Sequence, residues 1–183
     1  GANTSGDKNT AIGHQALYLS TTASYNAAIG MYALASVTTA DQNTGLGYGA
    51  GSNTTTGANN TFVGYDAEAS SATASNEVCL GNSSVSALRC QVDVSVLSDE
   101  RDKTDIVDLP VGLDFINTLR PIKFKWQTRE GTNKDGTVRA GFTAQQLKAA
   151  QTDAEADYMN LVYESNPDKL EATYGNLIPV LVQ

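Results

Sequence analysis

The chain has 183 residues, a formal net charge of -8 and 7% aromatic residues. Such acidity excludes a broad basic face for phosphate, so nucleic acid is not an expected partner. No apolar run approaches a membrane span, and the first residues lack a signal-peptide pattern, so we expect no membrane insertion. Because the chain starts at Gly rather than Met, we interpret it as a fragment of a longer protein.

Five glycines lie seventeen residues apart in the first part of the chain, each after an aliphatic residue. The aligned passes are NTAIGHQAL (9–17), NAAIGMYAL (26–34), NTGLGYGAG (43–51), NTFVGYDAE (60–68) and EVCLGNSSV (77–85), the last interpreted as an end cap. A fixed period of this length predicts a stacked repeat. We expect each pass to form a short strand, a bend at glycine and a Ser/Thr/Asn turn, with architectural roles for the repeated Asn, Gly and Ala.

Residues 1–88 are poor in large apolar side chains, which predicts too small a core for a single chain. Composition alone would suggest disorder, but the period argues against it. We therefore expect the aliphatic stripe of the repeats to be buried against identical chains, in a parallel homotrimeric β-solenoid or β-roll shaft. The choice of a trimer over a dimer rests on the resemblance described below.

The remaining sulfur and imidazole groups do not predict a metal site, a cofactor or a disulfide scaffold. Cys79 and Cys90 match no zinc spacing and are expected to be small buried residues, while His14 is expected at the surface.

The second half of the chain predicts an α+β domain. Residues 89–97 are expected to form a connecting strand, because Val92, Val94 and Val96 alternate with polar residues. Further elements are expected in chain order: a helix over 108–120, a strand over 121–127, a hairpin turn at 133–136, a strand leading into a helix over 138–150, and the start of a helix within 174–183.

A series of motifs follows this order. S-D-x-R-x-K at 98–103, L-R-P, F-K-W, G-F-T-A-Q and Y-G-N-L-I-P-V-L-V together resemble the intramolecular chaperone domain of phage tail fibres and tailspikes, the S74 peptidase family. The resemblance covers residues 98–183. The repeats in turn resemble those of phage fibre shafts and YadA-like adhesin heads. Family members continue into a long C-terminal helix, whereas this chain ends at Gln183, which we interpret as truncation of that helix.

The resemblance implies that the chaperone helps three chains to trimerise and then cuts itself free at the Leu97–Ser98 bond. Ser98 would be the nucleophile and Lys103 its base, with Asp99 and Arg101 as supporting residues. A lysine accepts a proton only as a neutral amine, a state that burial or nearby positive charge favours. The cut would be a single self-cleavage, with no external substrate. Local sequence alone favours another interpretation, in which Ser98 and Asp99 cap a helix and Lys103 lies on its exposed face.

These features favour the distal segment of a phage tail fibre or tailspike, assembled in the host cytoplasm as part of the virion. Its partners would be two identical chains and a host cell-surface receptor such as a polysaccharide. Exposed tyrosines could contact such a glycan, although repeated tyrosine is more often packing along a rod: Tyr18, Tyr25, Tyr32, Tyr48 and Tyr65.

Two other functions remain open at this stage. A bacterial trimeric adhesin head would use the same repeats and would require a membrane anchor downstream. A glycan-degrading rod would need a paired carboxylate site, which the few acidic residues of the repeats do not suggest: Asp7, Asp41, Asp66, Glu68 and Glu77.

Overall fold

The computed structural model describes residues 3–127 and 136–182. The chain divides into two compact units, which are described separately. The first comprises Gly1–Val85 with Ser165–Lys169, and the second comprises Ser86–Glu164 with Leu170–Gln183. The first unit therefore ends three residues before the boundary expected from composition.

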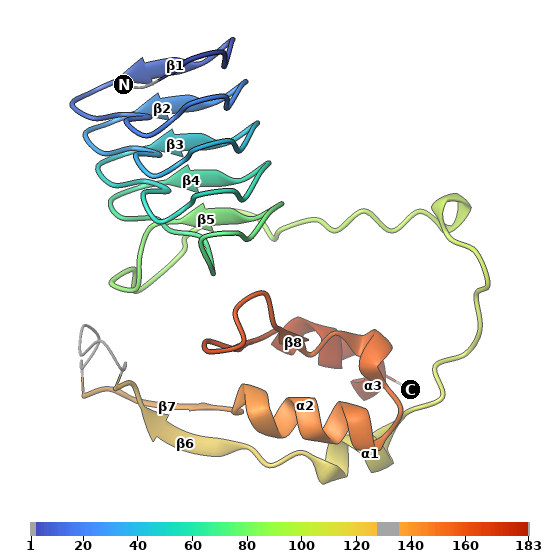
Figure 1. Ribbon diagram of the computed structural model, residues 1–183. Coiled ribbons are helices and arrows are strands. Elements are labelled where there is room, and N and C mark those ends of the chain that lie inside the picture. The colour runs from blue at the N-terminus through green and yellow to red at the C-terminus, as the bar shows by residue number, and fades with distance from the viewer. Residues whose placement is uncertain (1–2, 128–135, 183) are drawn as a thin grey trace. The chain divides into compact units, whose positions relative to one another are not determined.

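The first unit is a parallel β-solenoid of about four turns (Figure 1). Its strands stack in chain order, and each residue pairs with the residue seventeen positions later, so that Ile12 lies beside Ile29 and Leu46 beside Val63. The strands are β1 (Thr10–Ile12), β2 (Ala27–Ile29), β3 (Thr44–Leu46), β4 (Thr61–Val63) and β5 (Val78–Leu80). The period of the sequence is thus the length of one coil, and the expected solenoid is confirmed.

The repeated glycines lie where one coil bends over the next. Gly47 has a φ of 136°, a backbone conformation that side chains with a Cβ rarely adopt. A Cβ atom there would lie 2.5 Å from the carbonyl oxygen of Gly64 in the following coil. Both the bend and the close approach of the coils therefore require glycine, as the sequence predicts.

A ladder of buried asparagines links the coils. Asn43 donates its backbone N–H to Oδ1 of Asn26 (2.9 Å), and its own Oδ1 accepts the N–H of Asn60 (3.0 Å). The Asn43 amide nitrogen also donates to the carbonyl of Gly57 (2.9 Å), so both the oxygen and the nitrogen of this side chain are hydrogen-bonded. Because buried polar groups are costly when unpaired, this ladder holds the coils in register. The architectural role predicted for these residues is confirmed.

The solenoid has an apolar interior of its own, so the expectation that a single chain could form no core is wrong. The middle residues of the strands point inward, among them Ala28 and Phe62, which are fully buried. They join Leu34, Val37 and several alanines in one buried cluster. The coils are close enough for alanine to fill much of the space, and the buried asparagine amides are paired in the ladder. A count of large side chains therefore underestimates the core.

The aliphatic residue before each repeated glycine points outward. These side chains form one column on the strands and retain between 38% and 60% of their surface: Ile12, Ile29, Leu46, Val63 and Leu80, which we call the aliphatic stripe. Side chains alternate between the two faces of a strand, so an inward middle residue places its neighbour outside. The stripe predicted from the sequence thus lies on the surface of the single chain.

Residues 86–98 connect the solenoid to the next regular element and form neither helix nor strand. The strand expected over 89–97 is therefore absent from the single chain. Val92, Val94 and Val96 are 76–83% exposed, and Cys90, which was expected to be buried, is also exposed. A strand needs a neighbour to satisfy its backbone, and the described part of the chain provides none for this segment.

The second unit contains the expected α+β elements. The two longer strands, β6 (Ile122–Lys125) and β7 (Val138–Gly141), pair antiparallel, and α2 (Ala144–Asp153) follows β7 directly. Of the hairpin turn expected at 133–136, residues 133–135 lie outside the described residues. The C-terminal elements are η2 (Asp157–Met159), β8 (Val162–Tyr163), β9 (Glu171–Ala172), η3 (Tyr174–Leu177) and α3 (Ile178–Leu181). They confirm the start of a helix within 174–183.

The helix expected over 108–120 is shorter than predicted. It forms α1 (Leu113–Thr118), with Gly112 as its N-cap. Pro110 and Gly112 disfavour earlier helical turns, and Arg120 precedes Pro121, which biases it away from helical geometry. Phe115 of α1 joins a buried cluster with residues of α2 and the C-terminal elements, including Leu147, Leu161 and Val180. Among the residues described, no helix has the length and apolar character needed to cross a bilayer.

Candidate functional site

The S-D-x-R-x-K motif forms a single tight turn. A short 3-10 helix, η1 (Glu100–Asp102), follows Asp99, whose carboxylate accepts the backbone N–H of Arg101 at 2.9 Å. Lys103 closes the turn by donating its backbone N–H to the carbonyl of Glu100 (3.1 Å). The capping role that local sequence favours for Asp99 is therefore present, although the helix is only one turn long.

The turn brings the two predicted catalytic side chains together. Nζ of Lys103 lies 2.7 Å from Oγ of Ser98 and 3.4 Å from the Ser98 carbonyl oxygen. The first distance is that of a normal hydrogen bond between an amine and a hydroxyl. Such contact between a nucleophile and its base is the geometric requirement for activating a serine. Lys103 also lies at an exposed position, as the capping interpretation expects, and makes this contact from there.

Asp99 and Arg101 form a two-point ion pair beside this contact. The Arg101 guanidinium donates from Nε to Oδ1 (3.0 Å) and from Nη2 to Oδ2 (2.6 Å) of Asp99. The side-chain bond from Arg101, with its backbone N–H, lowers the pKa of Asp99 below its ordinary value. The carboxylate in turn raises the pKa of Arg101. The positive charge of Arg101 is thus balanced by Asp99, and the pair fixes the shape of the turn.

All the residues of the motif are exposed in the single chain, and Leu97 is fully exposed. A protonated amine cannot accept the serine proton. The single chain holds the Ser98 and Lys103 side chains in contact at an exposed position, without exclusion of water. This exposure cannot be seen in the sequence motif.

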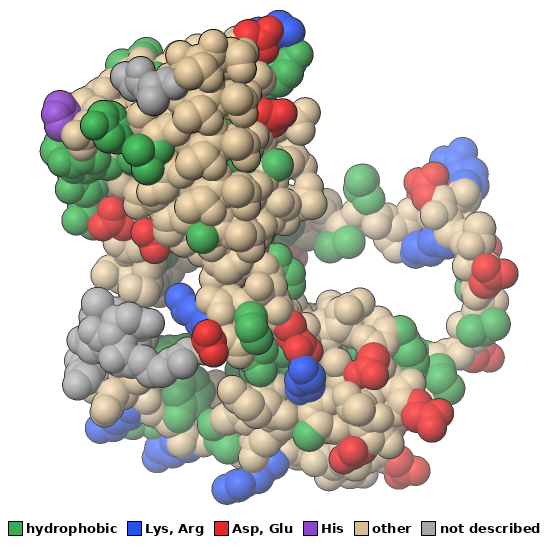
Figure 2. All heavy atoms as spheres, viewed as in Figure 1, with side chains coloured by type: hydrophobic (Ala, Val, Ile, Leu, Met, Phe, Trp, Pro, Cys, Tyr) green, Lys and Arg blue, Asp and Glu red, His purple; other side chains and the backbone are tan. Residues whose placement is uncertain are grey.

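The tyrosines of the repeats stack on one another. The rings of Tyr48 and Tyr65 lie 5.3 Å apart and nearly parallel, and Tyr32 contacts Tyr48 edge to face at 5.8 Å. His14 is exposed, as expected, and begins this column 5.9 Å from Tyr32. Figure 2 shows green hydrophobic side chains gathered next to the purple His14 on the solenoid. Rings that face each other have less surface for a sugar, which favours a packing role.

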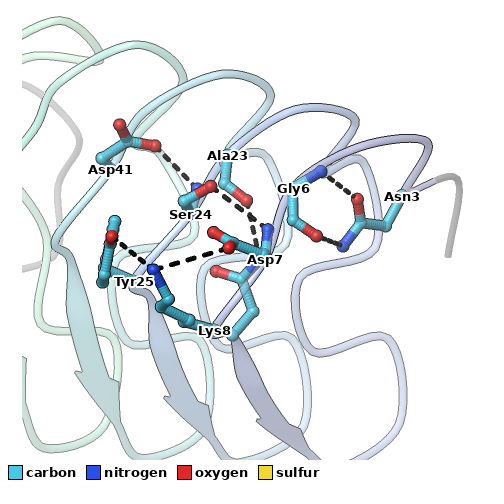
Figure 3. Close-up of polar contacts among 9 residues, drawn as sticks. Asn3, Gly6, Asp7, Lys8, Ala23, Ser24, Tyr25 and Asp41 are labelled. Atoms are coloured by element: carbon cyan, nitrogen blue, oxygen red, sulfur yellow. Dashed lines mark hydrogen bonds and ion pairs between the residues drawn. The ribbon is translucent and has the colours of Figure 1, made fainter.

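Polar side chains of the first coils form hydrogen bonds between neighbouring turns (Figure 3). Asp41 accepts the backbone N–H of Ser24 at 2.7 Å, and the Ser24 hydroxyl accepts the N–H of Asp7 at 3.2 Å. Lys8 donates to the Tyr25 hydroxyl at 2.7 Å, with its Nζ 4.5 Å from the ring centre. Among the described residues, no group of three or more His, Cys, Asp or Glu side chains could hold a metal ion.

One feature of the second unit was not predicted from the sequence. A cavity of about 850 Å³ lies between α1 and α2, with Leu113, Phe115, Phe142 and Leu147 among its lining residues. Each of these side chains belongs to an ordinary amphipathic pattern, and only the packing of the two helices creates the space. The cavity therefore carries no signal in the sequence.

The comparison with protein families identifies part of the second unit. Residues 98–155 match the family model Peptidase_S74, described as the chaperone of endosialidase. The match begins at Ser98 and covers η1, α1, β6, β7 and α2, which supports the expected chaperone domain over that range. The repeats lie outside it. No curated protein and no solved structure matches the chain.

Proposed function

We propose that this chain is the distal segment of a phage tail fibre or tailspike, in which residues 98–183 act as a chaperone that trimerises the shaft and then cuts the Leu97–Ser98 bond. The observation that carries this proposal is the 2.7 Å contact between Lys103 Nζ and Ser98 Oγ at the first residue of the family match. The solenoid immediately before it provides a shaft.

The aliphatic stripe supports assembly with identical chains. Its five side chains are aligned across the stacked strands, one per coil, and all are exposed. Neighbouring strands lie about 4.8 Å apart, so the stripe forms a continuous apolar column along the shaft. Covering such side chains contributes on the order of 1 kcal/mol each. A parallel trimer would cover the same column on every chain at once.

The proposed reaction begins with transfer of the Ser98 hydroxyl proton to the neutral amine of Lys103. Oγ then attacks the carbonyl carbon of Leu97, and the C–N bond to Ser98 breaks as its nitrogen takes up the proton held by Lys103. The product is an ester between Leu97 and Oγ of Ser98. Water hydrolyses this ester, which leaves a carboxylate on Leu97 and restores the serine hydroxyl.

Assembly would provide the missing condition for this reaction. Packing three chaperones together removes water from the exposed turn, and a desolvated amine loses its proton more readily. An unassembled chain would keep its bond intact. Cutting would therefore follow folding, and loss of the chaperone would make the shaft kinetically stable.

In this proposal the mature trimer belongs to the virion and carries contacts for a host cell-surface receptor. A bacterial adhesin head remains the alternative, because its repeats have the same pattern. The family match at residues 98–155 supports the phage structure, since the resemblance to an S74 chaperone begins after the solenoid and its connector.

The proposal is tested by comparing wild type, Ser98→Ala and Lys103→Arg on denaturing gels and by native mass measurement. Wild type should yield a fragment ending at Leu97, while both variants should remain full length and trimeric. Arginine keeps the positive charge but cannot act as the base, so Lys103→Arg is a stringent control. Processing of Ser98→Ala, or an uncut wild-type trimer, contradicts the self-cleavage.

A further inference from the structure

The segment before the cleavage site has one apolar and one polar side. In an extended chain, residues at even positions share a face: Leu88, Cys90, Val92, Val94 and Val96. The odd positions carry the polar side chains of Arg89, Gln91, Asp93 and Ser95, followed by Leu97. Every member of the even face is exposed in the single chain. We call this set the even face.

The backbone of the same segment is also without partners. Over the described part of the chain, no hydrogen bond involves the backbone of residues 87–97. In the single chain the segment bends at Gln91 and Val92, so it is not one continuous extended stretch. Its alternating valines and unsatisfied backbone nevertheless have the pattern of a strand that lacks its neighbours. A partner must therefore present an apolar surface to the even face. The charged side chains of the segment must remain on its other face.

We propose that residues 88–96 of three identical chains form a parallel, in-register bundle with the even face inside. The inference rests on the proposed homotrimer and adds the site at which the chains meet. In register, identical residues stand at the same height, so Arg89 and Asp93 meet their copies only on the outer, hydrated face. In the sequence, the exposed stripe residue Leu80 and the exposed Val85 precede Leu88.

The bundle connects assembly to the chemistry. Asp99 still has an extended backbone, with φ of -67° and ψ of 132°, so the alternation reaches the turn. Ser98 is the next even position after Val96. Its hydroxyl, with Lys103 at 2.7 Å, therefore occupies the end of the bundle's apolar interior. Three chains packed in register would exclude water at this end, while a chain alone would leave the pair exposed.

The natural thiol of Cys90 tests the bundle directly. In full-length Ser98→Ala protein, N-ethylmaleimide labelling of Cys90 is compared with labelling of Gln91→Cys in a Cys90→Ser background, with the modified peptides identified by mass. We expect labelling at position 90 to be at least about tenfold slower than at position 91 in the native trimer, because a buried thiol is inaccessible. In urea the two rates should be equal.

The outcomes separate this inference from the function on which it rests. Equal labelling rates in a protein of trimeric native mass overturn the bundle and leave the trimer standing. A monomeric native mass overturns the trimer and the bundle together.

A second pair of variants connects the bundle to cutting. Val94→Asp places a charge on the even face, while Ser95→Asp places it on the outer face. We expect Val94→Asp to slow release of the fragment ending at Leu97 at least about tenfold, because three buried carboxylates are strongly disfavoured. Ser95→Asp should cut near the wild-type rate. Equal cutting by the two variants overturns the proposed orientation of the strand.

Discussion

Nζ of Lys103 lies 2.7 Å from Oγ of Ser98, a contact made within a single turn of one chain. The two side chains of the proposed catalytic pair are therefore in contact before any assembly takes place. In the proposal, other chains supply the exclusion of water from this exposed turn. The predictions below test the parts of this arrangement separately: the turn, the shaft and the surface for assembly.

The ion pair between Asp99 and Arg101 predicts how the turn responds to acid. Arg101 lowers the pKa of Asp99, so the folded carboxyl stays charged below the pH at which an unpaired one protonates. Its contribution to the turn is thus present above the ordinary carboxyl range and lost as the pH falls through the lowered pKa. NMR titration should show the Asp99 midpoint moving upward in Arg101→Gln. The midpoint should be unaffected in the control, Arg89→Gln. An unchanged Asp99 midpoint in Arg101→Gln would contradict the ion pair.

Replacing Asn43 by alanine should destabilise the solenoid by about 2–4 kcal/mol. The change leaves the buried N–H of Asn60 and the carbonyl of Gly57 without their partners, and each such loss costs about 1–3 kcal/mol. Urea unfolding monitored by circular dichroism measures the effect. The control is Thr56→Ala at an exposed position, which should cost less than about 1 kcal/mol. Similar losses in the two variants would refute the role of the ladder.

Gly47→Ala should distort the junction between the third and fourth coils. The new Cβ would meet the carbonyl oxygen of Gly64 at 2.5 Å, and the φ of 136° is strained for alanine. We expect a loss of at least about 2 kcal/mol in the free energy of unfolding. Gly175→Ala is a matched control, because nothing lies within 4 Å of its added Cβ. A Gly47→Ala protein as stable as the control would show that the coils do not approach as described.

A charge on the aliphatic stripe should block assembly more than folding. Leu46 is already exposed in the single chain, so Leu46→Asp costs that chain little. In a trimer it would bury a carboxylate against two apolar neighbours, which costs several kcal/mol. Native mass measurement should show loss of trimer for Leu46→Asp and normal trimer for Thr56→Asp, at an exposed turn position. A trimeric Leu46→Asp protein would move the interface to another face.

The sequence predicts the solenoid well because the period is a local signal repeated in every coil. The glycine at position 47 and the ladder through Asn43 each have a physical reason that the alignment of the passes already suggests. The core was underestimated because large side chains were counted, whereas Ala28 and its neighbours fill a narrow interior. The helix around Phe115 is shorter than its apolar spacing predicts, because Gly112 and Pro110 disfavour the earlier helical turns.

The candidate site was predictable in its contacts and unpredictable in its environment. Ser98 and Lys103 are five residues apart, so one turn brings them together, and the ion pair of Asp99 with Arg101 is equally local. Burial depends on residues distant in the chain or in other chains, and no local pattern specifies it. The same reason explains the expected strand over 89–97: its alternation was visible in the sequence, but the partner needed to pair it was not.

The dependence of cutting on chain concentration tests the central claim most directly. Full-length protein unfolded in urea is diluted over about a hundredfold range of final concentration, and the fragment ending at Leu97 is quantified by mass over time. If association activates Ser98 and Lys103, the fraction of chains cut per unit time should rise steeply with concentration until assembly is no longer limiting. A cutting rate per chain that is the same at every concentration would contradict the coupling of cleavage to assembly.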